Sequence, residues 1–134
     1  MTQTITRMNP PSLPDAGAAG YSQISIAEPG RLAFMSGQVA WRSDGKPTPT
    51  TLLGQTEVVI GNLEAALAAV GATPHHLVML KIYVVDLTPE RMAEAMPLVM
   101  TFLGGAQPSL TGVGVAALAG PGLQLEIEMV VRLP

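Results

Sequence analysis

Apolar and polar residues alternate most regularly near the end of the chain, between residues 123 and 132. One set comprises Leu123, Leu125, Ile127, Met129 and Val131, and the other comprises Gln124, Glu126, Glu128, Val130 and Arg132. Successive side chains of a β-strand point to opposite faces of the sheet. The pattern therefore predicts a strand with one apolar face and one largely polar face.

Three further segments have the two-residue spacing of strands. In residues 21–38, Ile24 and Ile26 alternate with polar residues, and a turn signal at residues 28–30 precedes a second alternating run. This arrangement predicts a β-hairpin. Residues 78–85 are apolar on one face and mostly apolar on the other, which predicts a strand covered on both sides. Residues 110–118 predict another strand.

Two segments have the spacing of helices. Between residues 53 and 70 apolar residues recur three and four apart, and Gly71 follows where a helix would end. A second helix is predicted from Thr88-Pro89-Glu90, which has a capping residue, a proline in the first turn and an acidic residue. Pro97 is expected to break or kink this helix, and Gly104-Gly105 to end it.

The predicted order is β-β-α-β-α-β-β, which is typical of an α+β fold with one sheet and both helices on one face. Residues 1–20 have no period, contain several prolines and predict an extended N-terminal arm. We expect a single domain over residues 1–134, because two domains in this length would each be too small to build a core.

Composition indicates how the second face of the sheet is covered. Hydrophobic residues make up 48% of the chain and charged residues 13%, against about 25% charged in an average domain. A small monomer would expose much of this apolar surface, so we expect a homo-oligomer.

Residues 95–125 carry no charge, but prolines and glycines interrupt them, so they do not predict a membrane span. The N-terminus lacks the apolar centre of a secretory signal, and a cytoplasmic location is expected.

Several kinds of chemistry are disfavoured. The seven basic residues are scattered and the net charge is −3, which argues against nucleic-acid binding. There is no cysteine to form a disulfide or serve as a nucleophile. His75-His76 could ligate a metal, but no further ligand is suitably spaced, and a solvated loop is the preferred interpretation. We therefore predict neither a metal nor a cofactor.

Glu126 and Glu128 are the strongest candidates for chemistry by position, because they share one face of one strand. Two carboxylates there could share acid–base work if they are partly buried. From spacing alone, a solvated or salt-bridged strand face is the better interpretation of a Glu pair. The aromatic residues Tyr21, Trp41 and Tyr83 are equally well explained by core or interface packing.

Several short motifs together resemble the RidA/YjgF family of reactive intermediate deaminase-like proteins, also known by the older label endoribonuclease L-PSP. In chain order they are Tyr21-Ser22-Gln23, Phe34-Met35-Ser36-Gly37-Gln38-Val39, Gln55-Thr56 with Asn62-Leu63 and Gly71, Tyr83-Val84-Val85-Asp86-Leu87, Pro108-Ser109-Leu110-Thr111 and Glu126-Ile127-Glu128. The resemblance covers about residues 18–132. It implies a chorismate-mutase-like fold and a homotrimer, with the sheets around a central barrel and a ligand cleft at each subunit interface.

The resemblance also implies roles for individual residues. In deaminase members, which hydrolyse enamines and imines such as 2-aminoacrylate, an Arg binds the substrate carboxylate while a Tyr and a Gly line the cleft. A Glu of the last strand positions or activates water. The Tyr corresponds to Tyr21, the Gly to Gly37 and the Glu to Glu126. Leu110 and Thr111 fall in the segment that carries the substrate-binding Arg.

Leu110 stands where the family has that Arg. A guanidinium holds a carboxylate through two charge-assisted hydrogen bonds that an aliphatic side chain cannot make. Losing them weakens binding by about a hundredfold or more. Met96 stands near the position of a helix Asn common in the deaminases. Arg42, or Arg7 from a neighbouring chain, could supply another cation, although an exposed loop charge is the preferred interpretation of Arg42.

Two hypotheses follow. The first is a hydrolase of the RidA type acting on an imine, enamine or carbonyl compound other than 2-aminoacrylate, with Glu126 as general base or water-positioning group. Its substrate would be less anionic or more apolar, in keeping with Leu110. The second is a non-catalytic trimer that binds a small metabolite or assists a pathway enzyme. Endoribonuclease activity is disfavoured by the sparse basic residues.

Overall fold

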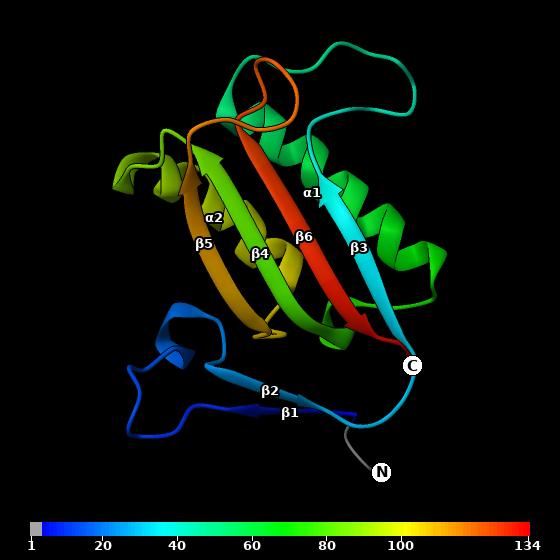
Figure 1. Cartoon of the computed structure of the whole chain (residues 1–134), viewed down its shortest axis with the longest axis vertical. Coiled ribbons are helices and arrows are strands. Elements are labelled where there is room, and N and C mark those ends of the chain that lie inside the picture. The colour runs from blue at the N-terminus through cyan, green and yellow to red at the C-terminus, as the bar shows by residue number, and fades with distance from the viewer. Residues whose placement is uncertain (1–3) are drawn as a thin grey trace.

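The computed structural model describes residues 4–134, which form six strands and two α-helices (Figure 1). The strands are β1 (Ile5–Met8), β2 (Ile24–Ala27), β3 (Leu32–Gln38), β4 (Leu77–Val85), β5 (Ser109–Val115) and β6 (Leu125–Arg132). The helices are α1 (Leu52–Ala69) and α2 (Pro89–Leu103), with short 3-10 helices at Gly17–Ala19 and Pro74–His76.

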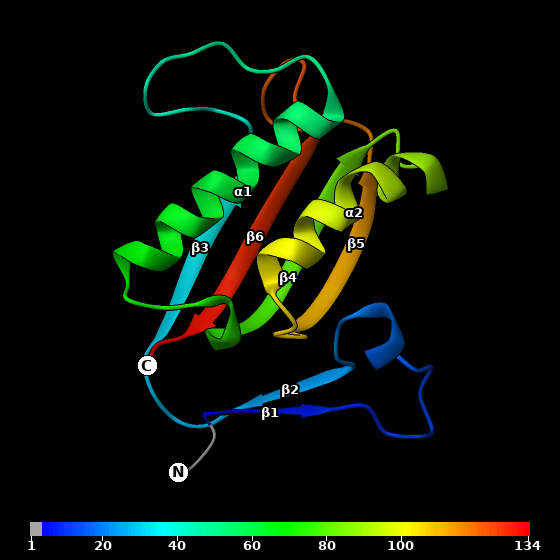
Figure 2. The same ribbon diagram turned by 180° about the vertical axis from the view of Figure 1, so that it is seen from behind.

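The main sheet has the strand order β3-β6-β4-β5, in which β4 and β5 are parallel and the other pairs antiparallel. β1 and β2 form a separate antiparallel pair, which a parallel bridge between Ser22 and Ser109 connects to the start of β5. Both helices cover one face of the main sheet (Figure 2), and Figure 1 looks onto the uncovered face. The predicted α+β class, with two helices on one face, is confirmed.

The core lies between the helices and the sheet. The apolar set of β6 is buried there, as its alternation predicts, and meets the buried residues of α1 and α2. The fully buried side chains include Leu63 of α1, Val99 of α2, Leu80 and Ile82 of β4, and Ile127 of β6. The remaining set of β6 therefore faces the uncovered side.

The predicted hairpin over residues 21–38 is wrong. β2 pairs with β1, and β3 pairs with β6 near the other end of the chain. A two-residue alternation identifies a strand but not its partner, because every partner imposes the same period. The sheet is consequently divided into two, and β1 lies within the segment predicted to be an extended arm. The first three residues of that arm lie outside the described residues.

The helices begin where capping residues satisfy their free backbone donors. The hydroxyls of Thr51 and Thr88 accept hydrogen bonds from the backbone N–H groups of Gly54 and Arg91. A break or a kink was expected at Pro97. The break is wrong, because α2 continues through this residue to Leu103. Burial of α2 residues on both sides of the proline offsets the lost backbone hydrogen bond.

The uncharged stretch 95–125 is divided among the second half of α2, strand β5 and the loop before β6. Across residues 4–134, neither helix combines the length and the apolar character needed to cross a bilayer. The apolar residues of α2 in this stretch and Leu110 of β5 pack against the core, while most of β5 is exposed.

Candidate ligand site on the uncovered sheet face

Gly37 and Glu126 meet on the uncovered face, where β3 lies beside β6. The register between these strands shifts between Met35 and Gln38, as at a β-bulge. A Cβ atom added to Gly37 would lie only 2.6 Å from the Glu126 carboxyl carbon. Glycine thus leaves the space that the Glu126 side chain occupies, and Glu126 is partly rather than fully exposed.

β4 places two polar side chains beside the carboxylates. Tyr83 lies opposite Glu126 and Lys81 opposite Glu128 in the register of β4 and β6. The Tyr83 hydroxyl donates a short hydrogen bond to Glu128 Oε1. Within the described chain, the Glu126 carboxylate has no hydrogen-bond partner. The two glutamates are therefore in different states: Glu128 is held in place by Tyr83, while Glu126 is free to bind a water or a ligand.

The pKa of Tyr83 is raised above its ordinary value of 10.0. The largest cause is the hydrogen bond to Glu128, which requires the protonated phenol, and it is followed by desolvation and by the negative charges of Glu128 and Glu126. The contribution of this group to stability is therefore fully present below pH 10. It is lost as the pH rises through the raised pKa, because the unfolded state then releases the proton more readily.

Tyr83→Phe tests this arrangement. In an alkaline titration followed by tyrosinate absorbance, the variant should lack one tyrosine ionisation that the wild type shows. We expect the midpoint of this ionisation in the wild type to lie above pH 10. Stability measured by urea unfolding should fall above pH 10 more steeply for the wild type than for Tyr83→Phe, and Tyr21→Phe is the matched control. A missing ionisation at or below pH 10 would contradict the hydrogen bond to Glu128.

The other predicted site residues lie at the edge strand β5. Tyr21 precedes Ser22, which is buried and donates from its hydroxyl to the Gln107 carbonyl at 2.6 Å. Leu110 lies opposite Leu80 and packs against the core on the helix side. Thr111 lies opposite Lys81 and so faces the uncovered side, where it is exposed. Leu110 and Thr111 therefore point to opposite faces of the sheet.

The structure thus places the five predicted residues in two separate groups. Gly37 and Glu126 are in contact, whereas Thr111 is separated from β6 by strand β4, a span of about 10 Å. Three surface cavities, of ≈ 730, ≈ 770 and ≈ 460 Å³, are lined by none of the five residues.

Sequence analysis named Arg42 and Arg7 as possible substitutes for the missing arginine. Both guanidinium groups already have partners within the chain. Arg42 pairs with Asp44 at 3.5 Å in an exposed loop, in accord with its preferred interpretation. Arg7 donates to Ser25 Oγ at 3.1 Å and to the His75 carbonyl at 3.3 Å in its own chain. Ser25 Oγ is in turn 2.8 Å from the Ser109 hydroxyl. Partial burial lowers the pKa of Arg7.

The remaining candidates have local partners. The Thr73 backbone N–H donates to His76 Nδ1 at 3.0 Å, and Met96 packs against the core. Over residues 4–134, no cluster of three or more His, Asp or Glu side chains could hold a metal ion.

Tyr83 and Lys81 were missed as site residues by sequence reasoning. Their two-residue spacing put them on one face, but only the pairing of β4 with β6 shows that this face carries the glutamates.

Comparison with known proteins agrees with this fold. The family model described as Endoribonuclease L-PSP matches residues 13–133. The Escherichia coli RutC family protein YjgH is 36% identical over 107 residues, which is 78% of each chain. The chain therefore belongs to the RidA/YjgF family.

Solved structures place it within the same fold. A Rid family protein of unknown function from Yersinia pestis is 34% identical, with a TM-score of 0.89 over 98% of this chain and 100% of that one. RidA from an Antarctic Psychrobacter is 25% identical, with a TM-score of 0.70 over 98% and 100% of the two chains.

Proposed function

We propose that three copies of this chain assemble through their uncovered sheet faces, forming small-molecule clefts between subunits. The observation that carries the proposal is the apolar surface of β3 on the uncovered face, where Phe34 is 75% exposed and Leu32 47% exposed. Such surface in one chain favours association. A cleft between neighbours would also bring Gly37 and Glu126 of one chain to the β5 edge of another. The two separate groups of site residues would then belong to one site shared by two subunits.

In these clefts Glu126 is the general base or water-positioning group. Its carboxylate would accept a proton from water as the oxygen adds to the carbon of an imine. Glu126 then passes this proton to the nitrogen, and the carbinolamine releases ammonia as its hydroxyl proton is transferred to the leaving nitrogen. Imine and water thus yield carbonyl compound and ammonia. Glu126 suits this role because it is partly buried and has no internal hydrogen bond to break in the described chain.

The substrate class follows from residue 110. Leu110 packs on the core and offers no donor to a carboxylate. The substrate is therefore an imine, enamine or carbonyl compound less anionic or more apolar than 2-aminoacrylate. No cofactor is required for this hydrolysis. The expected cytoplasmic location and the absence of nucleic-acid binding belong to the same proposal.

Freshly generated 2-aminoacrylate and its carboxamide, which differ only in the charged group, form a matched pair of test substrates. We expect the wild type to accelerate hydrolysis of the amide above the uncatalysed rate and to act poorly on the acid. Wild-type preference for the acid would contradict the substrate class.

A non-catalytic trimer that binds a metabolite or assists a pathway enzyme is the second candidate. The observation in its favour is the missing guanidinium at position 110. If neither substrate is hydrolysed faster than in buffer while native mass spectrometry shows a trimer, this candidate replaces the hydrolase. A monomer at micromolar concentration would contradict both candidates.

A further inference from the structure

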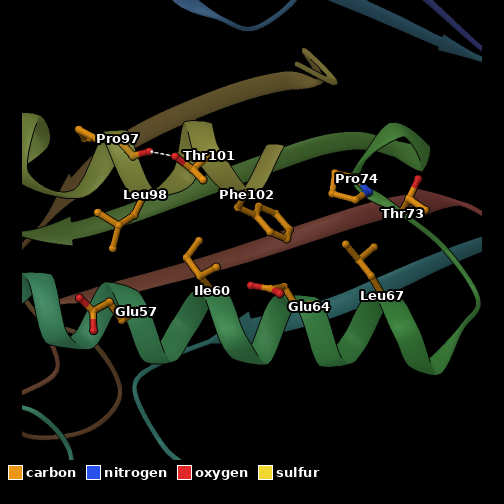
Figure 3. Close-up of a pocket in the computed structure, with 10 residues that line it drawn as sticks. All are labelled: Glu57, Ile60, Glu64, Leu67, Thr73, Pro74, Pro97, Leu98, Thr101 and Phe102. Atoms are coloured by element: carbon orange, nitrogen blue, oxygen red, sulfur yellow. Dashed lines mark hydrogen bonds between the residues drawn. The ribbon is translucent and has the colours of Figure 1, made fainter. Parts of the chain in front are cut away.

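A groove lies between α1 and α2, on the face of the sheet opposite Glu126 (Figure 3). Its volume is ≈ 730 Å³, within the range of pockets that bind small organic ligands. The two helices supply most of its lining, and the segment before β4 closes one end. The lining residues are Glu57, Ile60, Glu64, Leu67, Thr73, Pro74, Pro97, Leu98, Thr101 and Phe102.

The lining combines an apolar floor with two unpaired carboxylates. The hydroxyls of Thr73 and Thr101 are already engaged, with His76 Nδ1 at 3.2 Å and with the Pro97 carbonyl at 3.0 Å. Over residues 4–134, neither Glu57 nor Glu64 forms a side-chain hydrogen bond or an ion pair. No lysine or arginine lines the groove. Its charge is therefore uniformly negative.

Glu64 and Phe102 define where a positive group would bind. Glu57 also borders a separate cavity, together with Arg42 and Asp44, which pair with each other. Glu64 borders only the groove among these cavities, and Figure 3 shows it directed into the space that the Phe102 ring borders from the facing helix. An ammonium group gains from both partners, because a carboxylate and the face of an aromatic ring each attract a cation.

We propose that this groove is a second ligand site, which binds a small organic cation with an apolar body. The ammonium group lies at Glu64 and Phe102, and the apolar body lies over Ile60 and Leu98. Charge complementarity selects this occupant over a neutral or anionic one of the same shape. The site is on the helix side of the sheet, so the proposal does not depend on the function assigned to Glu126.

Three probes with the same apolar body test the charge selection: 4-phenylbutylammonium, 4-phenylbutanol and 4-phenylbutyrate. Each is titrated into the full chain by calorimetry at low salt. We expect the cation to bind with the lowest Kd and to lose affinity as salt is added. Glu64→Gln should weaken its binding about fivefold, as for an exposed ion pair. Glu94→Gln, an exposed change on α2 outside the groove, is the matched control and should leave the Kd unchanged.

Three outcomes would overturn the proposal. One is equal affinity for the alcohol and the cation, and another is an equal effect of Glu64→Gln and Glu94→Gln. The third is association of trimers through this groove, seen in sedimentation as a larger species that Glu64→Gln or Phe102→Ala abolishes, because a second copy would then be the occupant. Binding of the cation should persist in Glu126→Gln, which keeps this test separate from the proposed hydrolysis.

Discussion

Glu126→Gln is expected to lower kcat for the proposed imine hydrolysis by about 10²–10⁴-fold, the usual contribution of a general base. The amide has the size of the carboxylate but cannot take a proton from water. Because Glu126 has no hydrogen-bond partner within the described chain, the substitution leaves no internal partner unsatisfied. The free energy of unfolding should therefore change little, and KM should change less than kcat. The measurement is ammonia release from the amide substrate under saturating conditions.

Two further variants separate the role of Glu126 from that of its surroundings. Glu128→Gln should reduce kcat far less, because Tyr83 already engages that carboxylate. Gly37→Ala should lower kcat with little change in stability, since the new methyl group would displace the end of the Glu126 side chain rather than the backbone. Equal activity of Glu126→Gln and the wild type would exclude Glu126 as the base.

Phe34→Glu is expected to convert the proposed trimer into monomers. Phe34 is 75% exposed in the single chain and lies opposite Val130 on the uncovered face. Burying a phenylalanine contributes about 1.5–3 kcal/mol, and an unpaired carboxylate in its place would have to be desolvated in each of three interfaces. Light scattering coupled to size exclusion should show the mass of one chain. The proposed hydrolysis should be lost with the trimer.

Leu53→Glu is the matched control, because Leu53 is also exposed, at 40%, but lies at the start of α1 on the helix side. It should remain trimeric. Both variants should fold, since neither residue belongs to the buried core. A trimer that survives Phe34→Glu would show that the copies associate through another surface.

Local periodicity accounts for what sequence reasoning predicted correctly. The strand of residues 123–132, both helices and the side of the sheet they cover follow from spacings of two and of three to four, which depend only on neighbouring residues. The limits of this reasoning appear at β2 and β3. Their alternation identifies each as a strand, but a hairpin partner and a distant partner require the same pattern.

The sequence by itself determined the α+β class and the family, and it predicts that Leu110 stands in place of the family's arginine, because each is read from local pattern or residue identity. Only the tertiary structure decided that β3 lies beside β6, which brings Gly37 against Glu126, and that Tyr83 holds Glu128 while leaving Glu126 free. These contacts join segments far apart in the chain. Their geometry depends on how the whole sheet packs against the helices, and no short-range pattern records that packing.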